Sequence, residues 1–97
     1  MNIIEATYNS EENGYATEPL QLTGDIKLEV KLSREGYVVI KQKDEDANIF
    51  RNVLVSSFCN EYKGKVYGTT KFEYIQIFTS VKPTTIQYEK INKTIIW

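Results

Sequence analysis

The residues from Asp44 to Asn48, with the sequence DEDAN, place acidic and amide side chains at alternate positions, as calcium-binding loops do. An EF-hand loop that began at Asp44 would need glycine at its sixth position and glutamate at its twelfth. Those two positions hold Ile49 and Val55. We therefore expect a solvated acidic turn at the tip of a hairpin and no bound metal, with a looser calcium site as the alternative.

A second group of residues, between positions 62 and 74, alternates lysine with aromatic side chains. Proteins that bind single-stranded nucleic acid stack bases on aromatic rings beside cationic side chains. The residues that would make these contacts are Lys63, Lys65, Tyr67 and Lys71. The same alternation arises in any half-buried strand, and the acidic first half of the chain would repel a phosphate backbone. A single-strand binder built on a small β-barrel is therefore an alternative function, and nucleic acid is not the partner we expect.

The chain lacks the residues on which most catalytic mechanisms depend. The sequence contains no histidine, which removes Ser-His-Asp triads, imidazole-ligated zinc and the usual near-neutral general base. Cys59 is the only cysteine, so no internal disulfide forms, and no histidine is present to activate its thiol. Glu29 and Glu73 have the residue types of a glycosidase pair, with no further motif to support them. We expect no enzymatic activity and no cofactor.

The chain ends in three bulky apolar residues, Ile95, Ile96 and Trp97. An apolar terminus either packs as a last strand of a sheet or contacts another chain. Tryptophan is enriched among the residues that dominate interfaces, so these three are candidate partner-interface residues. The first residues lack a basic region followed by a long apolar run, and no apolar stretch approaches the length of a membrane span. We expect neither a signal peptide nor a transmembrane helix.

Charge is unevenly divided along the 97 residues, although the net charge is only −1. Residues 1–48 contain ten acidic and five basic side chains, and residues 49–97 contain three acidic and seven basic ones. If strands from both halves interleave, this asymmetry disappears in space. If they do not, an acidic and a basic face would dock subunits head to tail.

The elements that position these residues are β-strands. Val, Ile and Thr together number 27, whereas Ala and Leu number 8, and β-branched residues favour strands over helices. The clearest strand lies in residues 25–32, where Lys27, Glu29 and Lys31 occupy one face. The other face carries apolar residues: Ile26, Leu28, Val30 and Leu32. This period of two predicts one buried and one solvated face.

The remaining segments repeat the pattern of short strands and turns. Residues 37–43 and 48–55 should pair as antiparallel strands, and residues 71–79, apolar on both faces, should form a central strand. Residues 9–19 are expected to form a polar loop, and residues 33–36 a turn in which Gly36 takes a positive φ. These assignments predict one all-β domain over residues 1–97, with seven or eight short strands. The expected fold is an antiparallel β-sandwich of immunoglobulin-like or jelly-roll type, with a small barrel as the alternative.

Residues 36–53 and 71–91 resemble segments of small all-β virion proteins of tailed phages. The shared elements are Lys41-Gln42 before an acidic tip, an aromatic returning strand at Phe50, a Tyr74 to Ile77 strand, Ser80 in a turn, and Thr85-Ile86 in a closing strand. The resemblance covers roughly half of the chain, and Ala47-Asn48 replaces the usual Asp-Gly tip. The abundance of Lys, Ile and Asn would suit a phage of a low-GC host, such as the crAss-like phages.

This resemblance implies a non-enzymatic structural protein of a phage virion: a capsid auxiliary, head-fibre or tail-associated protein. Such a protein would be assembled in the host cytoplasm and would bind copies of itself or other virion proteins, without a membrane and without catalytic residues. A module that binds carbohydrate or a cell surface is a further alternative, which a glycan array would test.

Overall fold

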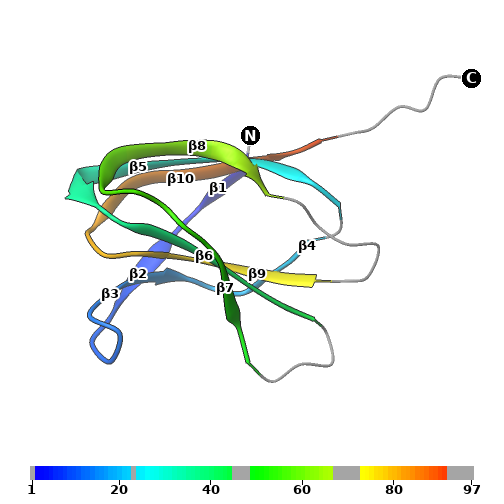
Figure 1. Ribbon diagram of the computed structural model, residues 1–97, viewed down its shortest axis with the longest axis horizontal. Helices are drawn as coiled ribbons and strands as arrows, with labels where there is room; N and C mark the ends of the chain where they lie inside the picture. The colour runs from blue at the N-terminus through cyan, green and yellow to red at the C-terminus, as the bar shows by residue number, and fades with distance from the viewer. Residues whose placement is uncertain (1, 23, 45–48, 67–72, 92–97) are drawn as a thin grey trace, which may run out of the picture.

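The computed structural model describes residues 2–22, 24–44, 49–66 and 73–91. In these ranges the chain forms ten strands in two antiparallel sheets that pack face to face (Figure 1), which confirms the predicted all-β sandwich architecture. The strands are β1 (Asn2–Ile4), β2 (Ala6–Asn9), β3 (Gly14–Thr17), β4 (Leu20–Leu22), β5 (Ile26–Gly36), β6 (Val38–Asp44), β7 (Arg51–Val55), β8 (Cys59–Val66), β9 (Glu73–Thr79) and β10 (Pro83–Lys90).

The first sheet, sheet A, has the strand order β1-β10-β5-β8, and the second, sheet B, has the order β2-β3-β9-β6-β7 with β4 also paired to β9. Each sheet therefore combines strands from both halves of the sequence. The opposite charges of the two halves are consequently mixed within each sheet, and no acidic or basic sheet results. Strands β6 and β7 pair antiparallel and β9 lies centrally in sheet B, as the apolar patterns predicted.

The core lies between the two sheets. The four apolar residues of β5 that the alternation placed on one face are all buried against sheet B. The other buried core residues are Val38, Ile40, Val66, Ile75, Ile77, Val81 and Ile86. They come from β6, β8, β9 and β10 and from the turn before β10, so the core is built by pairing residues distant in sequence.

The turn predicted at residues 33–36 is wrong. Strand β5 continues through these residues, because Gly36 still pairs with Cys59 on β8, and the chain crosses from sheet A to sheet B at Tyr37. Gly36 does not have a positive φ. Glycine is required at position 36 because there is no space for a side chain: a Cβ atom would lie 2.7 Å from Ser80 Oγ and 2.8 Å from Val81 Cγ2. Ser80 stabilises the chain where it crosses between the sheets, since its Oγ accepts a 2.8 Å hydrogen bond from Tyr37 N.

The polar loop predicted at residues 9–19 is also wrong in part. Strand β3 forms within it and pairs with β2 on one side and β9 on the other, leaving a short hairpin tip at residues 10–13. Asn13 takes the left-handed conformation at this tip, with φ 54°. Gly14 follows because a side chain there would collide with the Phe78 ring and would come within 2.7 Å of Thr79 O. This extra strand, the short strand β4 and the division of residues 2–9 at Glu5 raise the strand count of the described residues above the predicted seven or eight.

Candidate functional site

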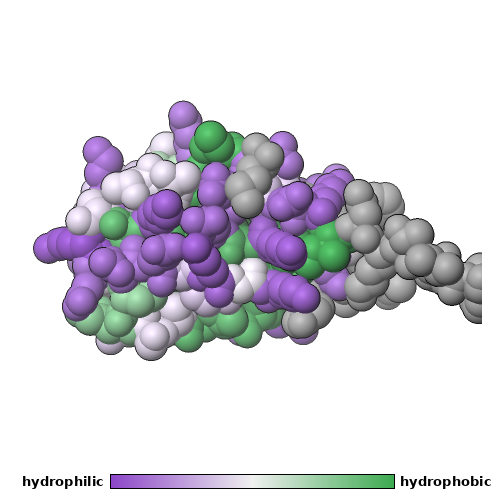
Figure 2. Space-filling model, turned by 90° about the horizontal axis from the view of Figure 1, so that it is seen from above, coloured by the Kyte–Doolittle hydropathy of each residue, from purple (hydrophilic) through white to green (hydrophobic). Residues whose placement is uncertain are grey.

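The outer face of sheet A carries the lysines that the alternating pattern placed toward solvent. Cross-strand pairing sets Lys27 opposite Lys65, and Glu29 opposite Lys63, on the neighbouring strands β5 and β8. Figure 2 looks down on this side of the molecule and shows hydrophilic side chains gathered across its middle, with hydrophobic side chains between them and along one border. The two pairs face the same way because they are separated by two residues along each strand.

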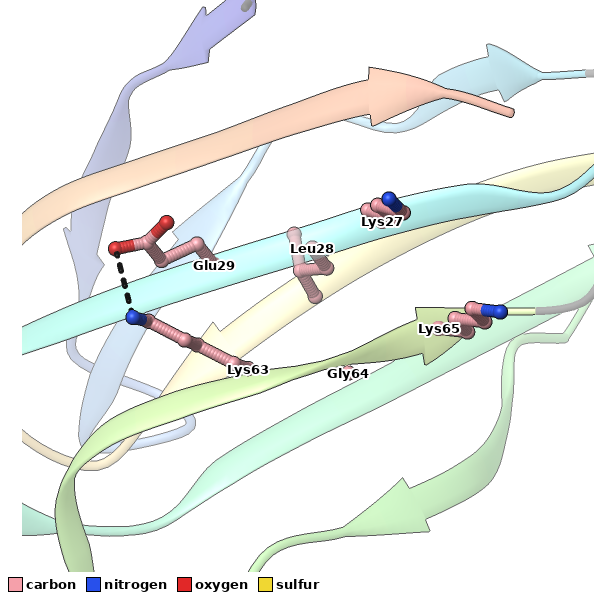
Figure 3. Close-up of a pocket in the computed structure, with 6 residues that line it drawn as sticks. All are labelled: Lys27, Leu28, Glu29, Lys63, Gly64 and Lys65. Atoms are coloured by element: carbon pink, nitrogen blue, oxygen red, sulfur yellow. Dashed lines mark ion pairs between the residues drawn. The ribbon is translucent and has the colours of Figure 1, made fainter. Parts of the chain in front are cut away.

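A depression of about 300 Å³ lies between these two pairs, and Figure 3 shows the residues that line it. At one end Glu29 and Lys63 turn toward each other, and at the other end stand Lys27 and Lys65. The middle is open because position 64 and its cross-strand partner Leu28 face the core, so that neither contributes a side chain to the outer face. The walls are therefore charged side chains and the floor is backbone.

The Glu29 end of the depression is electrostatically satisfied. The carboxylate of Glu29 accepts a 3.2 Å hydrogen bond from Gln87 Nε2 and lies 3.7 Å from Lys31 Nζ and 4.0 Å from Lys63 Nζ. Lys63 also lies 3.1 Å from a carboxylate oxygen of Glu61. The hydrogen bond and charge of Glu61, together with the charge of Glu29, raise the pKa of the Lys63 ammonium. This lysine is therefore cationic at neutral pH and already paired.

The opposite end of the depression differs. Neither Lys27 nor Lys65 forms an ion pair with any residue in the described part of the chain, although Glu89 is the neighbour of Lys27 on β10. Like charges directly opposite each other on neighbouring strands repel. An external carboxylate or phosphate oxygen between the two ammonium groups would reduce this repulsion. The geometry can therefore hold an anionic group, and these side chains present no nucleophile or neutral base for catalysis.

Of the residues proposed for nucleic-acid contact, the structure places Lys63 and Lys65 on the outer face of sheet A, two residues apart on β8. Tyr67, Lys71, Ile95, Ile96 and Trp97 lie outside the described residues, as does the acidic tip at residues 45–48. Tyr62 points away from the lysines and packs against the core, where partial burial raises the pKa of its hydroxyl. On the described part of β8, lysines and the tyrosine are therefore on opposite faces, so they do not form a shared stacking surface.

Sequence reasoning missed Lys27 as a member of this site. Its outward orientation was evident from the alternation in residues 26–32. What residue spacing could not show is that β8, some 35 residues later, is the neighbour of β5. The pairing register alone brings Lys27 and Lys65 together.

A different surface, on the outer face of sheet B, is apolar. We call it the apolar row: four side chains that are cross-strand neighbours in series, namely Ala16, Phe78, Val39 and Val55. Val55, on the edge strand β7, is 58% exposed. Beside it, the exposed rings of Tyr37 and Phe58 contact each other with centroids 5.3 Å apart. The row is only partly covered, by Lys41, whose Nζ lies 5.3 Å from the centroid of the Phe78 ring.

Comparison of the chain with models of protein families, with curated proteins and with solved structures found no match. In the part of the chain that the structure describes, no helix has the length and apolar character that crossing a membrane requires. Within the same residues, His, Cys, Asp and Glu do not gather in threes that could bind a metal ion. Function is therefore inferred from the surfaces described above.

Proposed function

We propose that this protein is a non-enzymatic structural protein of a phage virion, acting through contacts with copies of itself or with other virion proteins. It would serve as a capsid auxiliary, head-fibre or tail-associated protein. The sequence resemblance to small phage virion proteins suggests this setting. The structural observation that supports it is the apolar row, which runs across sheet B and ends at Val55 on the open edge strand β7.

Strand β7 is better suited to bind a partner than the edge strand β8. Natural sheets protect exposed edges with lysines, prolines and other charged residues. The eight residues of β8 include Glu61, Lys63 and Lys65, whereas the five residues of β7 include a single charged side chain, Arg51. On its outer edge β7 pairs with no other strand in the described part of the chain. Its backbone groups and the exposed Val55 side chain therefore offer both hydrogen bonds and apolar area to another chain.

Replacing Val55 with lysine is expected to weaken attachment to the virion or to other copies by roughly tenfold or more, about 1.4 kcal/mol. The lysine removes apolar contact and places a charge at the pairing edge. The measurements are sedimentation velocity of the purified protein and co-sedimentation with purified particles, followed by mass spectrometry of the particles.

The matched control is Ile3→Lys, since Ile3 is 73% exposed on β1, an edge strand of the other sheet. This control should attach as the unaltered protein does. An equal loss of attachment in both variants would show that β7 is not the binding edge. A strictly monomeric protein that is missing from mass spectra of virions would overturn the proposed function itself.

Single-stranded nucleic-acid binding is the second candidate, because Lys27 and Lys65, which have no ion-pair partner among the described residues, present two charges beside Lys63. If this is the function, an oligonucleotide should bind at low salt and dissociate as salt rises, since the binding releases counterions. Lys65→Glu should weaken that binding roughly tenfold, about 1.4 kcal/mol, whereas Lys82→Glu, elsewhere on the surface, should not. Absence of binding at low salt in a fluorescence anisotropy assay would eliminate this candidate.

A further inference from the structure

The tip of the β2–β3 hairpin presents two adjacent carboxylates, Glu11 and Glu12, on an ordered turn. The side-chain oxygen of Asn9 accepts hydrogen bonds from the backbone N–H groups of both glutamates, at 2.9 and 3.3 Å. At the base of the tip, Tyr8 and Tyr15 pack edge to face with ring centroids 5.4 Å apart. The hairpin is therefore held in one shape, and binding through it would cost little ordering entropy.

The two glutamates are available to a partner. Both residues are exposed. In the described part of the chain Glu11 forms no ion pair, and Glu12 has one, at 3.5 Å from Lys41 Nζ. The tip therefore carries more negative charge than its surroundings neutralise, just as the Lys27 and Lys65 end of the depression carries excess positive charge.

These two charged features lie at opposite ends of the molecule. Strand β3 meets β9 at Thr79, next to the crossing at Tyr37, and the hairpin tip projects beyond that point. Lys27 lies at the other end of β5, nine residues from Gly36, which is about 30 Å along an extended strand. Figure 1 shows the hairpin at the lower left and the beginning of β5 at the right.

We propose that the Glu11-Glu12 tip of one copy docks between Lys27 and Lys65 of the next copy. The inference extends the proposed function by naming a second copy of this chain as the partner and by giving the contact a direction. Such a contact joins two different surfaces, so it repeats head to tail and builds a ring or a filament. Two carboxylates meet two ammonium groups, which matches the charge of the depression.

The charges set the direction of this contact and its salt dependence. Ion pairs near a protein surface are screened within about 8 to 10 Å at physiological salt, so the association must weaken as salt rises. Complementary charge also suppresses the wrong orientations, because a tip meeting a tip or lysines meeting lysines would repel. The apolar stems of the lysines add contact area around the bound carboxylates.

The test is a charge exchange between the two surfaces, measured by sedimentation velocity at low and high salt. One variant carries Lys27→Glu and Lys65→Glu, and the other carries Glu11→Lys and Glu12→Lys. We expect the unaltered chain to associate at low salt, each variant alone to associate at least about tenfold more weakly, and an equal mixture of the two variants to recover association. Circular dichroism would confirm that each variant has the β-structure of the unaltered chain.

The matched control carries Lys82→Glu and Lys90→Glu, two exposed lysines outside the depression, and has the same change in net charge as the first variant. It should associate like the unaltered chain. Failure of the mixture to recover association, or loss of association in the control, would overturn the head-to-tail contact. If the variants still enter virions through the Val55 edge, the proposed function survives that result. If the chain also never enters virions, both inferences fall.

Discussion

Replacing Ile77 with alanine is expected to lower the free energy of unfolding by about 3 to 4 kcal/mol, within the usual range of about 2 to 5 kcal/mol for a buried isoleucine. Ile77 lies on β9, in the middle of sheet B, and its side chain is 0% exposed. Removing it leaves a cavity between two sheets that are held in place by their hydrogen-bonded ladders. Collapse around the cavity would therefore be incomplete, and the cost should approach the upper part of the range.

Thermal and urea unfolding would measure this effect. For a domain of this size, a loss of 3 to 4 kcal/mol corresponds to a decrease in Tm of roughly 12 to 30 °C. Ile3→Ala is the control, since the same chemical change at a side chain that is 73% exposed should alter stability by no more than about 0.5 kcal/mol. Similar midpoints for the two variants would contradict the central position of β9 in the core.

Replacing Thr17 with valine is expected to cost about 1 to 3 kcal/mol, because it leaves a buried backbone donor without an acceptor. Beside β9, the pairing strand is interrupted between β3 and β4, where Glu18 and Pro19 form no ladder contacts. Thr17 supplies hydrogen-bond acceptors at this interruption: its Oγ1 accepts a 3.0 Å hydrogen bond from Ile77 N, and its carbonyl oxygen accepts one of 3.0 Å from Gln76 Nε2. Valine has nearly the same shape and lacks the acceptor.

Two substitutions separate this effect from a general effect on packing. Thr17→Ser keeps the hydroxyl group, so it should retain most of the stability that Thr17→Val loses. Thr84→Val removes a hydroxyl that donates to Lys31 O on the exposed surface, and it should cost less than about 1 kcal/mol. Amide hydrogen exchange should accelerate at Ile77 in Thr17→Val alone. A valine variant as stable as the serine variant would show that the hydrogen bond does not stabilise the sheet at this interruption.

The strand and core assignments that the structure confirmed are those that depend on the local periodicity of the sequence. In residues 26–32, strict alternation placed every apolar side chain in the core and every charged one outside, because successive side chains of a strand point to opposite faces. The same rule identified the β6–β7 pair and the central position of β9. Such predictions need only the sequence of one strand and its immediate turn.

The predictions that were wrong concern places where distant residues decide the local structure. Residues 33–36 have the composition of a turn, yet Gly36 pairs with Cys59 on β8 and the segment remains a strand. Glycine is needed at position 36 because Ser80 and Val81 leave no space for a side chain. Residues 14–17 have the composition of a loop, yet β9 supplies a partner for them. A turn-like composition indicates which backbone conformations a segment can adopt, but it does not indicate which distant strand will pair with that segment.

The candidate site divides in the same way. From its own sequence, each lysine of β5 and β8 could be assigned to a solvated face, and the single cysteine and missing histidine limited the chemistry. Only the tertiary structure set Lys27 opposite Lys65, formed the depression between the two charged pairs and put the Glu11-Glu12 tip at the far end of the molecule. Side-chain direction follows from a period of two within one strand, whereas proximity between strands follows from register, which is determined by packing across the whole sandwich.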